Sequence, residues 1–244
     1  MQSINFQKKE EIAENTFIYT FSRPEKYSFE AGQYAVLRFN KELDIYPDAR
    51  GNVRTFSFAS APYEEELSFL MRQSESGFKK NIHKMSLGDS LEISDPMGNC
   101  SLSNMGENVQ NLVFICAGVG YSPMRSILRH IIKKEEIIPC LLINSNRTPE
   151  ATPEFQWIES LSQQYSHIKV INTMTDMEHS TSLWNGRREY IDENFLRGFI
   201  EDTPETQYFI AAGANFIQVM KNNLENMGIS KDRMFFDNFG SARS

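Results

Sequence analysis

Two closely spaced glycines follow a buried-looking apolar run at residues 112–117. Gly118 and Gly120 are separated by Val119, and Ser122 and Pro123 come next. Glycine lets a backbone approach a ligand closely, and the first turn of a helix offers unpaired N–H groups to phosphate oxygens. Ser122 is expected to cap a helix that begins at Pro123. The stretch predicts a strand–loop–helix unit that holds a pyrophosphate, although a merely tight turn would use the same residues.

A second candidate is the run Arg54-Thr55-Phe56-Ser57. A guanidinium group can hold phosphate oxygens through two parallel hydrogen bonds. Strand alternation places Arg54 and Phe56 on one face and Thr55 and Ser57 on the other. Composition alone favours an ordinary strand with an exposed arginine, so the run needs its context before it indicates a site.

The first hundred residues, in which the arginine lies, have the pattern of a β-rich domain. Short apolar segments, several of them alternating with polar residues, are separated by glycine and proline. Such a pattern predicts a small antiparallel barrel. The expected strands are 16–21, 33–39, 53–60, 67–72 and 90–93.

After about residue 104, apolar runs alternate with helical periodicity, which predicts a parallel, doubly wound sheet. Helices are expected over 123–134 and along the apolar stripe from Phe216 to Met227, which Gly228 would end. The Ser-, Asn- and Gly-rich segment 101–110 is the expected domain boundary. The expected strands are 112–117, 138–143, 169–174, 207–212 and 233–236.

Composition argues against nucleic acid, a membrane span and a metal as features of this protein. The 244 residues carry a formal net charge of −7, which repels nucleic-acid backbones. No apolar run approaches the ~20 residues of a membrane-spanning helix. The cysteines, Cys100, Cys116 and Cys140, lack metal-site spacing and are odd in number, which favours a reducing cytoplasm. The histidines show no ligand spacing either, so no metal is expected.

Several ordered motifs together resemble the ferredoxin–NADP reductase superfamily. The stretch 54–60, R-T-F-S-F-A-S, resembles its FAD signature, and 117–123, A-G-V-G-Y-S-P, resembles its nicotinamide loop. The other matching segments follow in the expected order and cover essentially the whole chain. They are 31–34 (AGQY), 77–81 (GFKKN), 95–98 (DPMG), 212–214 (AGA) and 236–239 (FDNF).

The resemblance implies a two-domain fold. A six-stranded antiparallel β-barrel over residues 1–103 would bind FAD. A C-terminal α/β domain over 110–244, with a doubly wound parallel five-stranded sheet, would bind NADPH or NADH. Hydride would pass from NADPH to FAD, and electrons would then leave for a separate acceptor: a ferredoxin, a flavodoxin, an oxygenase component or a small oxidant. Any iron–sulfur centre would lie on another polypeptide.

The resemblance also implies roles for individual residues. Arg54 would hold the FAD pyrophosphate, Ser57 would lie near the hydride path, and Asp237 and Phe239 would complete the catalytic set with it. Phe239 would stack on the flavin. The remaining implied cofactor-binding residues are Thr55, Phe56, Met71, Arg72, Gly77, Phe78, Lys79, Lys80, Gly118, Val119, Gly120, Ser122, Pro123 and Gly213.

A preference for NADPH is suggested by Ser145 and Arg147, which follow the second expected parallel strand. Sites selective for NAD often present an acid at the end of this strand to the ribose 2′-hydroxyl. Here the first acidic residue after the strand is Glu150, three positions beyond Arg147. The two side chains could instead hold a 2′-phosphate. Arg147 as an ordinary solvated loop residue is the alternative.

Two other functions stay open. One is an electron-transfer subunit of a larger dehydrogenase complex, although no cysteine follows Cys140 to build a C-terminal cluster. The other is a flavin- or nucleotide-binding sensor without catalysis, because fold does not fix function. Two departures from the family pattern leave the non-catalytic sensor open: Ala212 replaces the usual Cys, and Asp237 replaces the usual Glu.

Overall fold

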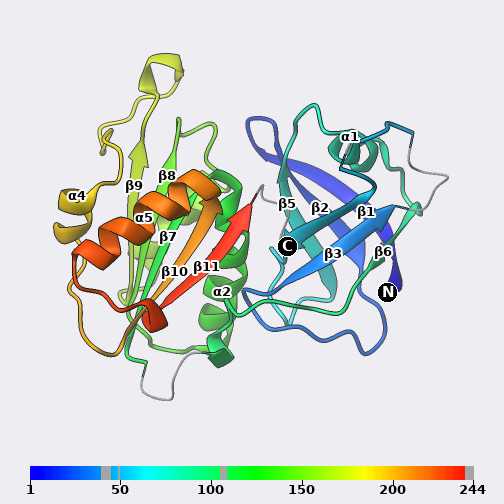
Figure 1. The fold of residues 1–244 in the computed structure, drawn as a ribbon. Helices are drawn as coiled ribbons and strands as arrows, with labels where there is room; N and C mark the ends of the chain where they lie inside the picture. The colour runs from blue at the N-terminus through cyan, green and yellow to red at the C-terminus, as the bar shows by residue number, and fades with distance from the viewer. Residues whose placement is uncertain (40–44, 49, 105–108, 240–244) are drawn as a thin grey trace. The chain divides into compact units, whose positions relative to one another are not determined.

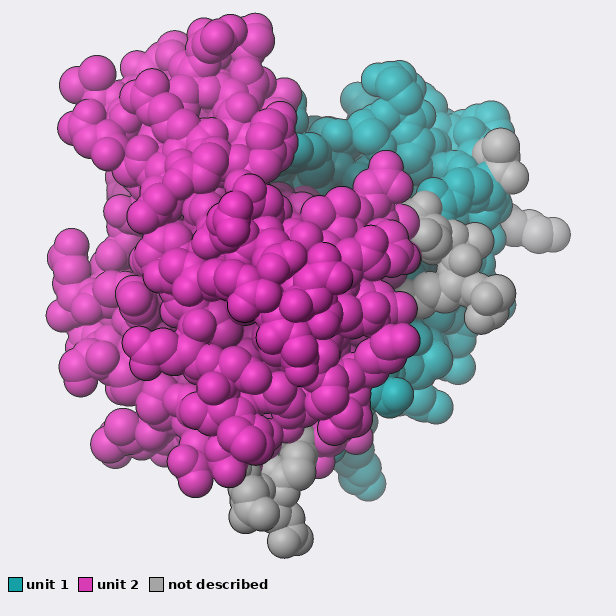
Figure 2. Space-filling model, turned by 60° about the vertical axis from the view of Figure 1, so that its left-hand side comes forward, with its two compact units in different colours: residues 1–102, 122–133 teal, residues 103–121, 134–244 magenta. Residues whose placement is uncertain are grey.

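The computed structural model describes residues 1–39, 45–48, 50–104 and 109–239. Part of the expected boundary segment 101–110 therefore lies outside the described residues. The chain divides into two compact units: residues 1–102 with 122–133, and residues 103–121 with 134–244 (Figure 2). The domain limits at 103 and 110 stay a prediction, and one helix from the second half of the sequence belongs to the first unit.

The first unit contains a six-stranded antiparallel sheet with the strand order β4-β3-β6-β1-β2-β5 (Figure 1). An antiparallel bridge between Phe58 and Phe69 brings the two edges of the sheet together and closes it into a barrel. The strands are β1 (Gln2–Ala13), β2 (Thr16–Ser22), β3 (Tyr34–Phe39), β4 (Val53–Ser57), β5 (Glu66–Arg72) and β6 (Ser90–Ile93).

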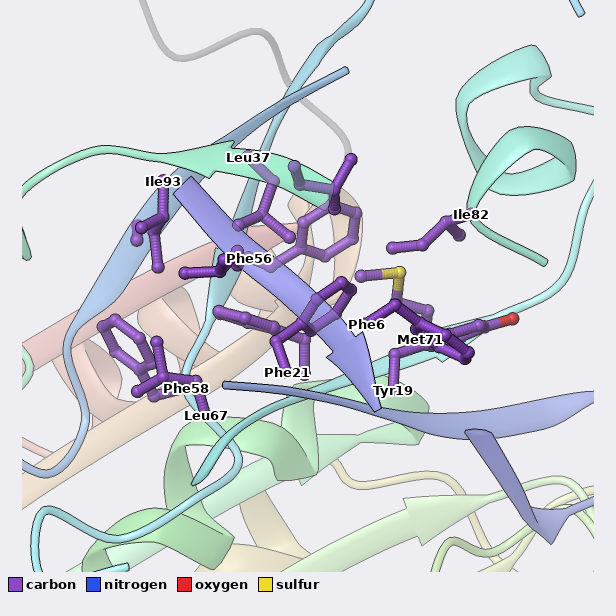
Figure 3. Packing of buried hydrophobic residues seen from close by; sticks show 14 of the residues in the cluster. Phe6, Tyr19, Phe21, Leu37, Phe56, Phe58, Leu67, Met71, Ile82 and Ile93 are labelled. Atoms are coloured by element: carbon purple, nitrogen blue, oxygen red, sulfur yellow. The ribbon is translucent and has the colours of Figure 1, made fainter. Parts of the chain in front are cut away.

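Aromatic side chains fill the interior of this barrel, where they point toward one another (Figure 3). Phe56 packs against Phe69 and Phe78 at ring-centroid distances of 6.4 and 5.6 Å. Alternation along β5 places Leu67 and Met71 in the same core. Helix α1 (Gly77–Lys84) and most of helix α2 (Tyr121–Lys134) belong to this unit.

The second unit is built on a five-stranded parallel sheet with the order β11-β10-β7-β8-β9 (Figure 1). The first strand, β7, lies at the centre, and the order reverses between β7 and β10. In open α/β sheets such a reversal marks the usual ligand-binding edge. The elements are β7 (Asn111–Ala117), β8 (Cys140–Asn146), α3 (Phe155–Gln164), β9 (Ile168–Met174), α4 (Glu193–Arg197), β10 (Thr206–Gly213), α5 (Ala214–Asn226) and β11 (Met234–Phe239).

The predicted fold class is confirmed, and the differences are local. Strand β1 was not predicted, because only Ile4 and Phe6 are buried, while the residues from 7 to 11 are polar and exposed. Helix α1, over residues that matched a family motif, was not predicted as a helix. Helix α5 ends as predicted, with Gly228 at a φ of 88° directly after the C-cap.

Candidate cofactor-binding sites

The first turn of α1 is surrounded by basic side chains. Burial lowers the pKa of Lys79, and the nearby charges of Arg72, Arg50 and Arg54 lower it further. Lys79 Nζ donates to the Arg72 carbonyl at 2.6 Å, and the Arg54 guanidinium lies 5.6 Å from the ring centroid of Phe78. In a chain of net charge −7 this concentration of cations at a helix N-terminus favours an anionic ligand. We call it the basic cluster: Arg50, Arg54, Arg72 and Lys79.

Arg54 is fixed by its own hairpin. Its Nη1 donates to the carbonyls of Arg50, Gly51 and Val53 at 2.9, 3.0 and 2.6 Å. Its Nη2 lies 2.5 Å from Asp48 Oδ1 as an ion pair, without the alignment of a hydrogen bond. The guanidinium therefore has a set orientation before any ligand arrives.

Asp48 is the residue that sequence reasoning missed. Its carboxylate accepts hydrogen bonds from Ser76 Oγ at 2.6 Å, from the Phe78 N–H at 3.1 Å and from the Arg50 N–H at 2.9 Å. The Ser76 hydroxyl above all, with these N–H groups and Arg54, holds the pKa of Asp48 well below its usual range. No local pattern could have found it, because 28 residues separate it from Ser76 in the chain.

The other predicted residues of the first unit lie in different surroundings. Phe56, Met71 and Phe78 have their side chains in the barrel core. Gly77 begins α1, and Thr55 lies half-buried on β4. Their roles in FAD binding stay predictions.

Lys80 is paired with a residue outside the basic cluster. Its Nζ pairs with Glu75 Oε2 at 2.6 Å, and the Glu75 side chain is 96% exposed. Lys80 is thus paired at the surface.

The expected cap at Ser122 is wrong. The helix begins at Tyr121, so Ser122 lies inside its first turn, and its hydroxyl donates to the Ser57 carbonyl at 3.0 Å. One turn later, Ser126 Oγ donates to the Ser60 carbonyl at 2.7 Å. These bonds attach α2 to the end of β4 within the first unit. Ser57 itself is buried, and Pro123 lies beside Ser122 in the same turn.

In the second unit, the predicted glycine loop forms a short 3₁₀ turn over Gly118–Gly120 at the end of β7. Gly118 has a φ of 55°, which favours glycine. A Cβ on Gly120 would lie 1.9 Å from the Ala211 carbonyl oxygen of β10. Close packing of the loop on β10 therefore accounts for Gly120, and Val119 between the two is half-buried.

Predicted residues from four strands meet at the carboxyl edge of the parallel sheet. Ser145 pairs with Ala117, the last residue before the glycine loop. Gly213 pairs with Phe239 across β10 and β11. Asp237 pairs with Ala211 and is buried. The sheet thus brings the nicotinamide-loop, 2′-phosphate and terminal motifs to one edge, at the switch in strand order.

Arg147 lies just beyond this edge, and acidic groups accompany it. The Asp176 N–H donates to the Arg147 carbonyl at 2.9 Å, and Asp176 Oδ1 lies 2.6 Å from His179 Nδ1. Glu150 accepts from the hydroxyls of Ser180 and Thr181. Burial raises the pKa of Glu150, but these hydrogen bonds outweigh it and hold the pKa below its usual range.

The thiols are poor candidates for chemistry. All three cysteines are buried, and burial raises the pKa of Cys140 to about 12. Within the described ranges, no group of His, Cys, Asp and Glu side chains could hold a metal ion. The same ranges contain no helix that is long and apolar enough to span a membrane.

Comparison with known proteins agrees with this geometry. Residues 114–222 match the oxidoreductase NAD-binding domain family. A crystal structure of a ferredoxin NADP⁺ reductase from Neisseria gonorrhoeae with bound FAD and NADP superposes with a TM-score of 0.80 at 20% identity, covering 97% of this chain and 98% of that one. The chain has the ferredoxin–NADP reductase fold.

Curated relatives of this reductase-fold chain include longer proteins. The flavohemoprotein of Bacillus subtilis is 25% identical over 98% of this chain and 59% of its own length. The reductase component of propane 2-monooxygenase from Gordonia sp. is 24% identical over 89% of this chain and 61% of its own. The chain thus spans about three fifths of the length of these relatives.

Proposed function

We propose that the chain is an FAD-dependent NAD(P)H oxidoreductase that takes hydride from NADPH and passes electrons to a separate acceptor. The observation that carries this proposal is the basic cluster at the first turn of α1. It lies where the family resemblance expects the FAD pyrophosphate, in a chain that is otherwise acidic. The family match over the NAD-binding half supports it independently.

The residues at the basic cluster fit a pyrophosphate. Arg54 is held in a fixed orientation by three backbone carbonyls, so little side-chain entropy is lost on binding. The Phe78 N–H points out of the helix terminus, where an anion is stabilised. Lys79, partly desolvated, strengthens the local positive potential. When bound, the flavin supplies the hydride-accepting chemistry, and the protein supplies binding and orientation.

The carboxyl edge of the parallel sheet is proposed to bind the nicotinamide dinucleotide. The Gly118–Gly120 turn places no bulky side chain where the strand order reverses between β7 and β10, and Gly213, at the end of β10, is exposed. Ser145 and Arg147 would hold the 2′-phosphate of NADPH. Asp176 and Glu150 work against an added negative charge, so NADH remains the second cofactor to test.

The acceptor is proposed by class only. The monooxygenase relative is named as the reductase component of its system, which supports an oxygenase component as one acceptor. A ferredoxin, a flavodoxin and a small oxidant are the other candidates. The cytoplasm is the compartment expected from an odd number of widely spaced, buried cysteines.

The experiment is reconstitution followed by rapid reduction. Purified protein is stripped of flavin, reloaded with FAD and mixed anaerobically with NADPH or NADH in a stopped-flow instrument. The proposal expects a yellow protein that bleaches faster with NADPH, followed by reoxidation when oxidants or carrier proteins are added. A protein that cannot be loaded with FAD would end the proposal, and one that loads but never bleaches would favour the sensor.

A further inference from the structure

The basic cluster is already in contact with an anion supplied by the chain itself. Asp48 reaches it from the connection between β3 and β4, and its side chain is only 8% exposed. Its carboxylate accepts hydrogen bonds from the Ser76 hydroxyl and the Phe78 N–H at the start of α1, and it pairs with Arg54. The carboxylate occupies donors that a phosphate oxygen would use.

The segment that carries Asp48 is docked firmly on the helix. We call residues 46–48 the Asp48 strap. The Tyr46 N–H donates to Asn81 Oδ1 at 2.8 Å, and Asn81 Nδ2 donates back to the Tyr46 carbonyl at 3.1 Å. A Cβ on Gly77 would lie 2.5 Å from the Tyr46 carbonyl oxygen and 2.6 Å from that of Pro47. Glycine at the first position of α1 is therefore required by the strap, whatever ligand binds there.

The donors that Asp48 uses cannot serve two acceptors well. A backbone N–H and a hydroxyl each have one hydrogen to donate. The two Nη1 hydrogens of Arg54 are not free to compensate, because Nη1 donates to backbone carbonyls, and Nη2 is held beside Asp48 as an ion pair. A phosphate at the start of α1 must displace the carboxylate, and the displaced charge would repel it.

We propose that Asp48 is an internal competitor for the flavin pyrophosphate, so that the Asp48 strap must release α1 before FAD binds tightly. The inference rests on the proposed function, because FAD is the ligand whose phosphates would enter the cluster. It makes the affinity for FAD a balance between two anions. The affinity for a flavin without phosphate, such as riboflavin, should not depend on Asp48, because such a flavin does not compete with the carboxylate.

The test removes the charge of Asp48 and keeps its shape. Flavin-free wild type and Asp48→Asn are titrated with FAD and with riboflavin, and binding is followed by flavin fluorescence. Asp48→Asn is expected to bind FAD at least about tenfold more tightly, the scale of one charge-assisted hydrogen bond, with riboflavin unchanged. Glu92→Gln is the matched control, because it makes the same charge change in an exposed pair with Arg38 on the barrel.

Several results would overturn the proposal. Unchanged or weaker FAD binding by Asp48→Asn would show that Asp48 merely orients Arg54. An equal gain for riboflavin would place the effect on the flavin ring instead of the phosphates. If circular dichroism shows that Asp48→Asn does not fold, Asp48→Ser, with a small neutral side chain, is measured in the same way.

Binding of inorganic pyrophosphate distinguishes a failure of this proposal from a failure of the proposed function. If no form of the protein binds FAD, the function fails, and pyrophosphate binding is measured by calorimetry instead. Tighter pyrophosphate binding by Asp48→Asn than by wild type would still support the competitor, and equal binding would refute it. If wild type and variant bind FAD equally well, the competitor is wrong and the function stands.

Discussion

The two proposed anion-binding sites, one in each unit, are built in different ways. In the barrel unit, charged side chains gather at one helix terminus, and Asp48 balances them. In the parallel-sheet unit, the carboxyl edge presents a glycine turn, Ser145 and Gly213, with Arg147 as the added cation. On this proposal, binding at the first site would depend on side-chain charge, and binding at the second would depend on how closely backbones approach.

This difference predicts which substitutions matter in each unit. Where charge does the binding, removing one cation should weaken the ligand and leave the fold intact. Where backbone approach does the binding, one added methyl group should damage the fold itself.

Gly120→Ala should cause the largest change. Its Cβ would lie 1.9 Å from the Ala211 carbonyl oxygen, and neither backbone can move cheaply. We expect the free energy of unfolding to fall by about 3 kcal/mol or more, measured by denaturant titration. Gly213→Ala is the matched control, because the nearest atom to its Cβ is the Phe239 carbonyl oxygen at 3.8 Å, an ordinary contact. Equal stability of the two variants would contradict the contrast.

Arg54→Ala should leave the fold largely intact and weaken FAD. Loss of a charge-assisted contact to phosphate is expected to cost about 1.5–3 kcal/mol, or roughly ten- to a hundredfold in the dissociation constant. Retention of FAD through gel filtration and fluorescence titration both measure this. Arg38→Ala removes an arginine whose side chain is 44% exposed and pairs with Glu92, and it should bind FAD as wild type does. A fully yellow Arg54→Ala protein would remove Arg54 from the site.

Arg147→Ala should have a smaller and more selective effect. We expect the KM for NADPH to rise about tenfold, from loss of one charged contact to the 2′-phosphate, while the KM for NADH stays nearly constant. Steady-state kinetics with both cofactors measure the ratio. Arg188→Ala, in the same unit, serves as the control for loss of one positive charge. Equal effects of Arg147→Ala on both cofactors would refute a 2′-phosphate role.

The smallest effects concern two histidines whose pKa values shift in opposite directions. In the barrel, burial lowers the pKa of His83, with Lys9 and Lys84 adding to it, so stability should rise with pH just below 6.5. In the sheet unit, Asp176 raises the pKa of His179, so that pair stabilises below pH 6.5 and its contribution is lost as pH rises through the raised value. His83→Gln and His179→Gln should each flatten one of these slopes in thermal unfolding scans. Identical pH profiles for both variants would contradict the assignment.

Much of the fold follows from periodicity, and the failures have physical causes. Strand β5 was predictable because Leu67, Phe69 and Met71 alternate into one core. Strand β1 was not, since most of its side chains stay in solvent and leave no apolar pattern. Helix α1 begins with Gly77 directly after Ser76, whose hydroxyl donates to Asp48 instead of forming a cap, and its first turn contains no acidic residue that would have marked its start.

The candidate site was predictable only in part, for a related reason. Motif resemblance found Arg54, Lys79 and the glycine turn, because each lies within a short ordered pattern. It could not find Asp48, whose partners at α1 lie 28 and 30 residues along the chain. The predicted cap at Ser122 is wrong because its hydroxyl donates to the Ser57 carbonyl of the barrel strand instead of accepting from the helix backbone. Contacts distant in sequence decided both cases.

The most direct test of the proposed function uses NADPH that carries deuterium at the transferable C4 position. Flavin-loaded protein is mixed with it anaerobically, and the bleaching rate is compared with that for unlabelled NADPH in a single turnover. If hydride passes from NADPH to FAD on this chain, the deuterated cofactor should bleach the flavin more slowly and lose its label. Absence of bleaching with either cofactor would contradict the account.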